Sequence, residues 1–98
     1  MTDEISIRLE EDGAKGRYIA SIEGLPDAEM TYSRVSPKVI IVDHTGVPED
    51  LRGKGVGAAL AENIIREARE KEFKIIPLCP FLKSQFDKNP DWADVLNG

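Results

Sequence analysis

Apolar and polar residues alternate through the N-terminal part of the chain, and this period of two is typical of strands with one buried face. The alternating segments run from Glu4 to Leu9, from Arg17 to Ile22 and from Ala28 to Arg34. Between them, residues 10–16 and 24–27 contain the glycine, proline and acidic residues that favour turns. The pattern therefore predicts three consecutive strands joined by turns.

The next apolar segment, from Lys38 to Asp43, has a continuous β-branched centre, which predicts a strand covered on both faces. The period then changes to that of an amphipathic helix, which we expect from about Leu51 to Lys71. Its apolar stripe consists of Val56, Leu60, Ile64 and Ala68. Residues Phe73 to Leu78 predict a fifth strand. A helix that joins two strands in this way usually makes a right-handed crossover between parallel strands.

Prolines mark the ends and starts of the elements expected in the C-terminal part of the chain. Pro77 and Pro80 flank the end of the fifth strand, and because proline donates no ladder hydrogen bond, we expect the strand to end or splay there. A short helix is expected from Phe81 to Asp87, and Pro90 fits the first turn of a last short helix. The chain, 1–98, is thus expected to form a single α/β domain with a mixed sheet. Four antiparallel strands precede a helix, a fifth strand parallel to the fourth, and short C-terminal helices.

Composition narrows the class of protein. The 98 residues are 41% hydrophobic and 32% charged, which fits one soluble globular domain. No apolar run is long enough to cross a bilayer, and the N-terminus lacks a signal-peptide pattern. Cys79 is the only cysteine, which favours a reducing, cytoplasmic location. The net charge of −5 argues against nucleic acid as a partner. We expect no membrane partner either, and a monomer or weak dimer.

A glycine-rich turn, Arg52-Gly53-Lys54-Gly55-Val56-Gly57, follows the apolar run of the fourth strand and opens the long amphipathic pattern. The first N–H groups of a helix lack internal partners, and the helix dipole adds positive charge there, so this place suits a phosphate. The P-loop pattern fails because no Gly-Lys pair precedes Ser or Thr. Gly53, Gly55 and Ala58 satisfy the dinucleotide pattern, but the order of strands around them is wrong for it. A purely structural turn remains the alternative.

The turn also fills the acyl-CoA pattern Arg/Gln-x-x-Gly-x-Gly/Ala with Arg52, Gly55 and Gly57. At this point the chain resembles the GCN5-related N-acetyltransferase superfamily, and more closely its small, single-domain acetyltransferase-like subfamily. The segments 44–48, 52–57 and 77–81 carry the resemblance. It implies a minimal version of that superfamily's fold, with acetyl-CoA as co-substrate and no metal.

The resemblance assigns the cofactor-binding residues to two stretches. Backbone N–H groups of the turn would bind the CoA diphosphate, and the candidate residues are Arg52, Gly53, Lys54, Gly55, Val56, Gly57 and Ala58. The backbone near Thr45 and Val47, at the end of the fourth strand, would lie along the pantetheine arm. The fourth and fifth strands would splay to admit the thioester.

Two residues are candidates for catalysis. Cys79 follows the fifth strand, where its thiol would serve as a nucleophile or as an acid toward the departing CoA thiolate; the alternative is a small buried apolar residue. His44 is the only histidine and would act as a base or activate Cys79 across the sheet; the alternative is a structural hydrogen-bonding role. Asp43 is expected on the opposite strand face and is the second choice for a base.

The predicted function is transfer of an acetyl group from acetyl-CoA to a primary amine. The acceptor, a protein, peptide or small molecule, is not specified by the sequence. Compared with full-length superfamily members, the chain lacks helices between the first two strands and has only a short stretch after Cys79. Because those elements help to shape the acceptor site, a CoA-binding or acyl-CoA-binding module without turnover is the alternative.

Overall fold

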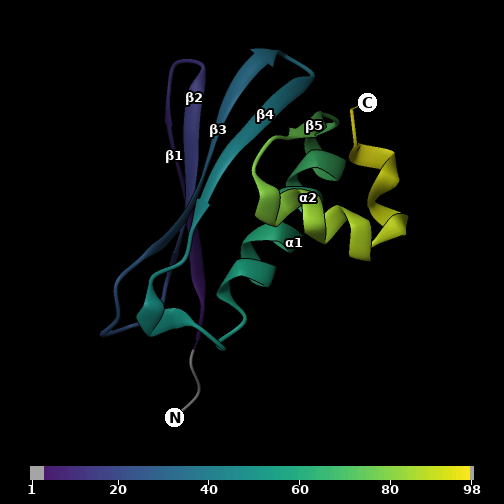
Figure 1. Ribbon diagram of the computed structural model, residues 1–98. Coiled ribbons are helices and arrows are strands. Elements are labelled where there is room, and N and C mark those ends of the chain that lie inside the picture. Colours follow the sequence, from purple (N-terminus) through teal and green to yellow (C-terminus); the bar gives the residue numbers. More distant parts are fainter. Residues whose placement is uncertain (1–3, 98) are drawn as a thin grey trace.

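The computed structural model describes residues 4–97. Its strands are β1 (Ser6–Asp12), β2 (Lys15–Ser21), β3 (Ala28–Ser36), β4 (Val39–Gly46) and β5 (Lys74–Pro77). Its helices are η1 (Glu49–Leu51), α1 (Val56–Lys71), α2 (Pro80–Lys88) and η2 (Pro90–Val95), of which η1 and η2 are 3-10 helices. The strands form one sheet in the order β1-β2-β3-β4-β5, antiparallel up to β4 and parallel between β4 and β5 (Figure 1). The predicted fold class is confirmed.

The hairpin between β1 and β2 is tighter than predicted. Its turn consists of Gly13 and Ala14 alone, and Gly13 has a φ of 63°, which favours glycine. The charged residues that the sequence placed in a long turn stay in the ladder. Glu10 pairs with Arg17 in register, and their side chains form an ion pair at 2.9 Å. Cross-strand partners therefore extend both strands beyond their apolar alternation.

The long helix begins later than predicted. Gly53 and Gly55 have φ angles of 78° and 75°, which are incompatible with a right-handed helix, so α1 begins at Val56. The segment expected to be its first turn is the separate helix η1 followed by turns. The glycine-rich stretch is therefore a true turn between strand and helix.

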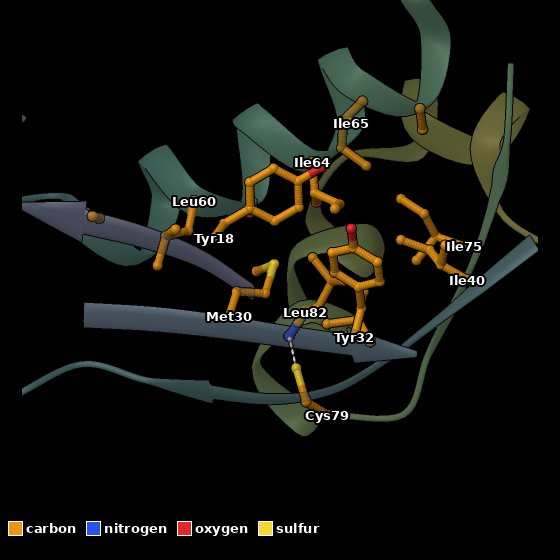
Figure 2. Packing of buried hydrophobic residues seen from close by; sticks show 14 of the residues in the cluster. Tyr18, Met30, Tyr32, Ile40, Leu60, Ile64, Ile65, Ile75, Cys79 and Leu82 are labelled. Atoms are coloured by element: carbon orange, nitrogen blue, oxygen red, sulfur yellow. Dashed lines mark hydrogen bonds between the residues drawn. The ribbon is translucent and has the colours of Figure 1, made fainter. Parts of the chain in front are cut away.

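One apolar core joins the sheet to the helices. The predicted stripe of α1 is fully buried, with Val56, Leu60, Ile64 and Ala68 all at 1% exposure or less. Figure 2 shows Leu60 and Ile64 of this stripe facing Tyr18 and Met30 of the strands. Helices α1 and α2 and η2 lie on the same face of the sheet (Figure 1). Among residues 4–97 the other face of the sheet has no helix, and Val39 and Ile41 of β4 are only half-buried. The prediction that this strand is covered on both faces is therefore wrong.

The C-terminal segment closes the core. β5 ends at Pro77, as expected, and Pro80 occupies the first turn of α2. The last helix is a 3-10 helix, and it carries Trp92, whose ring meets that of Phe86 edge-on at a centroid distance of 6.0 Å. Within residues 4–97, no helix combines the length and the apolar character needed to cross a membrane.

Candidate functional site

Strands β4 and β5 separate midway along β4. Their parallel ladder runs from the pair Val39–Lys74 to the pair Val42–Pro77 and ends there. The carbonyl of Val42 accepts hydrogen bonds from the N–H groups of Leu78 at 2.9 Å and Cys79 at 3.1 Å. Beyond this point β4 continues to Gly46, whereas the other segment turns into α2. The splay expected from the prolines is therefore present, and the β4 edge from 43 to 46 faces it.

The glycine-rich turn presents backbone rather than side chains. Gly55 caps α1, and the first helical hydrogen bond joins the N–H of Ala59 to the carbonyl of Gly55 at 3.0 Å. The N–H groups of residues 56–58 precede that bond, and no described side chain caps them. A Cβ built on Gly53 or Gly55 would meet nothing within 4 Å, so the backbone here is open to a ligand. Such uncapped N–H groups at the start of a helix suit an anion, and the diphosphate site stays a prediction here.

Gly57 has a different reason to be glycine. A Cβ at this position would lie 2.8 Å from Cζ of Phe81, on α2. The missing side chain therefore lets the Phe81 ring pack on the first turn of α1. This packing is a reason for glycine that the sequence did not indicate, and the approach of a diphosphate to the backbone N–H of Gly57 stays a prediction.

Charge around the turn is mixed. Arg52 has a side chain that is 75% exposed and forms an i,i+3 ion pair with Glu49 at 3.5 Å. Such an exposed pair contributes little free energy, so the guanidinium exchanges partners at small cost. Lys54 is half-buried beside it. The first turn of α1 contains no acidic residue, which leaves the positive end of the helix dipole uncompensated.

Cys79 is buried at the start of α2. Its side chain is the N-cap, and the sulfur accepts a hydrogen bond from the N–H of Leu82 at 3.4 Å (Figure 2). The hydroxyl of Thr45, from the far end of β4, lies 3.2 Å from the same sulfur. Only 3% of Cys79 is exposed. The sulfur is thus held in place by a helix terminus and by the strand on the other side of the splay.

A bulge in β4 decides which side chains face the core. Thr31 pairs with His44 and Tyr32 pairs with Val42, so Asp43 is an extra residue in the ladder. The extra residue brings Asp43 and His44 to the same face: Asp43 accepts a hydrogen bond from Thr31, and His44 lies 3.9 Å from Glu29. The expectation that Asp43 and His44 lie on opposite faces is wrong for this reason.

His44 and Cys79 consequently do not meet. The imidazole is 60% exposed on the helix-free face, while the sulfur is buried on the helix side of the sheet. Thr45, which pairs with Met30, occupies the position beside the sulfur that the sequence reasoning gave to His44. Sequence reasoning missed this role of Thr45 because nothing in the local sequence marks the bulge.

The helix-free face of the sheet is hollowed and carries charge. A depression of about 480 Å³ is lined by both signs of charge and includes Asp43, Glu10 and Arg17. The hydrogen bond from Arg17 lowers the pKa of Glu10 below its usual range. Across residues 4–97, no group of three histidine, cysteine or carboxylate side chains is arranged to hold a metal ion.

Sequence comparisons identify relatives over most of the chain. The model of the family described as GCN5-related N-acetyl-transferase matches residues 17–95. The protein NATD1 of Xenopus tropicalis is 29% identical over 92% of this chain and 84% of that protein. The human NATD1 protein is 27% identical over 86% of this chain and 75% of that protein.

Solved structures show the same fold. The solution NMR structure of a GCN5-like protein from Staphylococcus aureus is 35% identical and superposes with a TM-score of 0.67, covering 93% of this chain and 88% of that chain. A GNAT family acetyltransferase from Elizabethkingia anophelis, crystallised with acetyl-CoA bound, superposes with a TM-score of 0.64 at 15% identity. That match covers 78% of this chain and 65% of the other.

Proposed function

Because the chain belongs to the GCN5-related N-acetyltransferase family, as its three motifs predicted, we propose that it transfers an acetyl group from acetyl-CoA to a primary amine. The proposal depends on one observation, namely that two structural features lie next to each other. The splay of β4 and β5 opens beside a turn whose backbone N–H groups have no side-chain cap. The splay leaves the β4 backbone after Val42 without a strand partner on that side, where a thioester arm would lie, and the turn attracts a diphosphate.

The proposed cofactor site uses mainly backbone. The N–H groups of residues 56–58 would hold the diphosphate, and the left-handed Gly53 and Gly55 keep the surface beside them free of side chains. Arg52 and Lys54 add positive charge. Thr45 and Val47 would line the arm, since both follow the point where β5 leaves β4. The acetyl-CoA bound to the related Elizabethkingia anophelis fold supports this choice of ligand.

The side chains proposed for the chemistry lie on two different sides of the sheet. Acetyl-CoA supplies an activated acetyl group, and an attacking amine must first lose its proton to a base or to water. His44 is the proposed base, because it is exposed on the hollowed face and paired with Glu29. Asp43 lies beside it on the same face. Cys79 lies on the other side of the sheet, where its thiol is proposed to act as a nucleophile or as the acid that protonates the departing CoA thiolate. Its sulfur is oriented by the N–H of Leu82 and the hydroxyl of Thr45.

A specific observation favours a second function, binding of CoA without turnover. The two candidate catalytic groups lie on different faces of the sheet, and Cys79 is buried while His44 is exposed. A binding module needs the turn and the splay but needs neither side chain. The two functions therefore share the cofactor site and differ in whether an acceptor reacts.

Titration with CoA tests the shared part. We expect backbone amide shifts at residues 53–58 in a ¹H–¹⁵N spectrum, with the turn at Gly13 and Ala14 as an internal reference that does not move. Absence of shifts at 53–58 up to millimolar CoA contradicts both functions.

An acceptor screen separates the two functions. Release of free CoA from acetyl-CoA is measured with lysine peptides, polyamines and amino acids as acceptors, and Gly55→Ala serves as the variant with a blocked cofactor turn. We expect release that depends on both the acceptor and Gly55. If no acceptor raises the rate while CoA still binds, the binding module is the correct function.

A further inference from the structure

One row of residues crosses the helix-free face of the sheet from β1 to β4. Its members pair in register across the four strands, and they are Arg8, Ile19, Glu29 and Gly46. The two neighbours of Ile19 along β2 belong to the main core, so Ile19 and the side chains paired with it face the opposite side of the sheet. From β1 toward β4, the row therefore presents a cation, an apolar side chain and a carboxylate.

A pocket of about 390 Å³ lies along this row, and all four members of the row are among the residues that line it. Ile19 is only 4% exposed although it lies on the helix-free face, so the side chains around it shield this apolar centre of the row. Val47 lines the pocket as well, and it is also a candidate for contact with the pantetheine arm. The pocket thus shares a wall with the proposed cofactor site, and its volume is in the range of small-molecule sites.

The imidazole of His44 lies at the β4 end of the row. A Cβ on Gly46 would be 3.1 Å from Nε2 of His44, so the glycine leaves the space that the ring occupies. The same Nε2 lies 3.9 Å from Oε2 of Glu29, which is the partner of Gly46 in the ladder. The proposed base is therefore next to a carboxylate, at the end of the pocket that adjoins the unpaired part of β4.

The chain itself holds the two charges of the row loosely. Arg8 forms ion pairs with Glu10 at 3.5 Å and with Asp27 at 3.8 Å, and its side chain is 56% exposed. Glu29 forms an ion pair with Arg17 at 3.3 Å, whereas Arg17 lies closer to Glu10, at 2.9 Å. Long, exposed ion pairs contribute little free energy, so Arg8 and Glu29 can exchange them for charges of a ligand at small cost.

We propose that this pocket binds the acceptor, and that the acceptor is a small molecule in which an apolar chain joins a primary amine to a carboxylate. This assignment rests on the proposed acetyl transfer. The carboxylate binds Arg8, the chain lies over Ile19, and the ammonium group binds Glu29 beside His44. The amine is thereby placed at the end of the pocket that adjoins the proposed thioester site.

The spacing of the row selects among amines. Neighbouring strands are about 4.8 Å apart, so Arg8 and Glu29 rise from strands that are about 10 Å apart. An α-amino group and its carboxylate are attached to one carbon and do not span this distance, so the reacting amine lies at the far end of a chain. A diamine would bring a second ammonium group to Arg8, and these like charges repel each other. A lysine side chain within a protein lacks the carboxylate.

Acceptors that differ in one group test the assignment. We expect kcat/KM for release of CoA to be at least about tenfold higher with ε-aminocaproate than with n-hexylamine, which has the same chain and amine but no carboxylate. Arg8→Gln should abolish this preference. Lys88→Gln, at an exposed residue in the last turn of α2, removes the same charge far along the chain and should keep the preference.

Amide shifts give a readout that does not depend on turnover. On addition of ε-aminocaproate, with and without CoA, we expect shifts at residues 8, 19, 29 and 46 in the wild type and much smaller shifts in Arg8→Gln. Norleucine is the matched control, because it is an isomer of ε-aminocaproate with both charged groups on one carbon. It should shift these residues at least about tenfold more weakly at equal concentration.

The outcomes separate this assignment from the proposed function. Shifts along the row without release of CoA support the pocket and contradict acetyl transfer. Release of CoA at equal kcat/KM for ε-aminocaproate and n-hexylamine, or a preference that survives in Arg8→Gln, overturns the assignment and leaves acetyl transfer intact. Absence of shifts along the row with ε-aminocaproate overturns it as well.

Discussion

The hydroxyl of Thr45 and the sulfur of Cys79 lie 3.2 Å apart, although the residues are 34 positions apart in the chain. Thr45 belongs to the part of β4 that β5 no longer accompanies, and Cys79 begins the segment that turns away. The contact therefore joins the two walls of the splay at the place proposed for the thioester.

Replacing Cys79 separates its structural role from a chemical one. Cys79→Ala removes the acceptor for the N–H of Leu82, and loss of an N-cap costs about 1 kcal/mol of unfolding free energy. Cys79→Ser keeps an acceptor at the same place, so its stability should stay closer to that of the wild type. If the thiol takes part in acetyl transfer, both variants lose activity. The measurements are denaturant unfolding and release of CoA, and full activity in a folded Cys79→Ser excludes a role for the thiol.

Gly55→Ala should weaken CoA binding more than it destabilises the fold. Gly55 has a φ of 75° with open space around the Cβ position, so alanine introduces backbone strain of about 1 kcal/mol. Its methyl group also covers the surface proposed for the diphosphate. Gly24→Ala is a matched control, because Gly24 has a φ of 83° and equally open surroundings in a distant turn. Both variants should lose similar stability, and only Gly55→Ala should lose CoA affinity in calorimetric titration.

Gly57→Ala should destabilise the protein through packing. The new methyl group meets the Phe81 ring at 2.8 Å, and relief of such overpacking typically costs about 1–3 kcal/mol. Shortening the ring side chain with Phe81→Leu should absorb much of this cost. A double-mutant cycle measured by urea unfolding reports the coupling directly. Additive effects of the two substitutions contradict the proposed contact.

Stability should decline in alkaline solution. Burial, and then the hydrogen bond to Glu11, raises the pKa of Tyr32 from 10.0 to about 12. Since the unfolded chain releases this proton near pH 10 and the folded chain retains it, the contribution of Tyr32 is fully present below pH 10. It is lost as the pH rises from 10 to about 12, at roughly 1 kcal/mol per pH unit.

Urea unfolding between pH 8 and pH 11 measures this slope, and Tyr32→Phe should reduce it. Some slope should remain in that variant, because burial also raises the pKa of Tyr18. Equal slopes for the wild type and Tyr32→Phe would show that Tyr32 does not titrate in this way.

Much of the fold was predictable from local patterns. The alternation in the first three strands, the stripe from Val56 to Ala68 and the break at Pro77 each depend on residues that are close in sequence. Boundaries were less accurate where long-range partners decided them. The first hairpin extends to Asp12 because Glu10 and its neighbours find partners on β2.

The glycine turn shows how much of the candidate site could be predicted from the sequence. Its spacing predicted a backbone surface at the start of a helix, and the open positions of Gly53 and Gly55 agree with that expectation. The same spacing could not distinguish Gly57, which is glycine because of a ring that lies far along the chain. Motif residues of one type can therefore serve different purposes.

By itself, the sequence determined the periods of the strands and of the long helix, the place of the turn, and the family. Only the tertiary structure decided which side chains meet. The bulge at Asp43 turns His44 to the open face and Thr45 toward Cys79. The physical reason is that periodicity follows from backbone geometry within one segment. Strand register, in contrast, is set by hydrogen bonds and packing between segments that the local sequence does not encode.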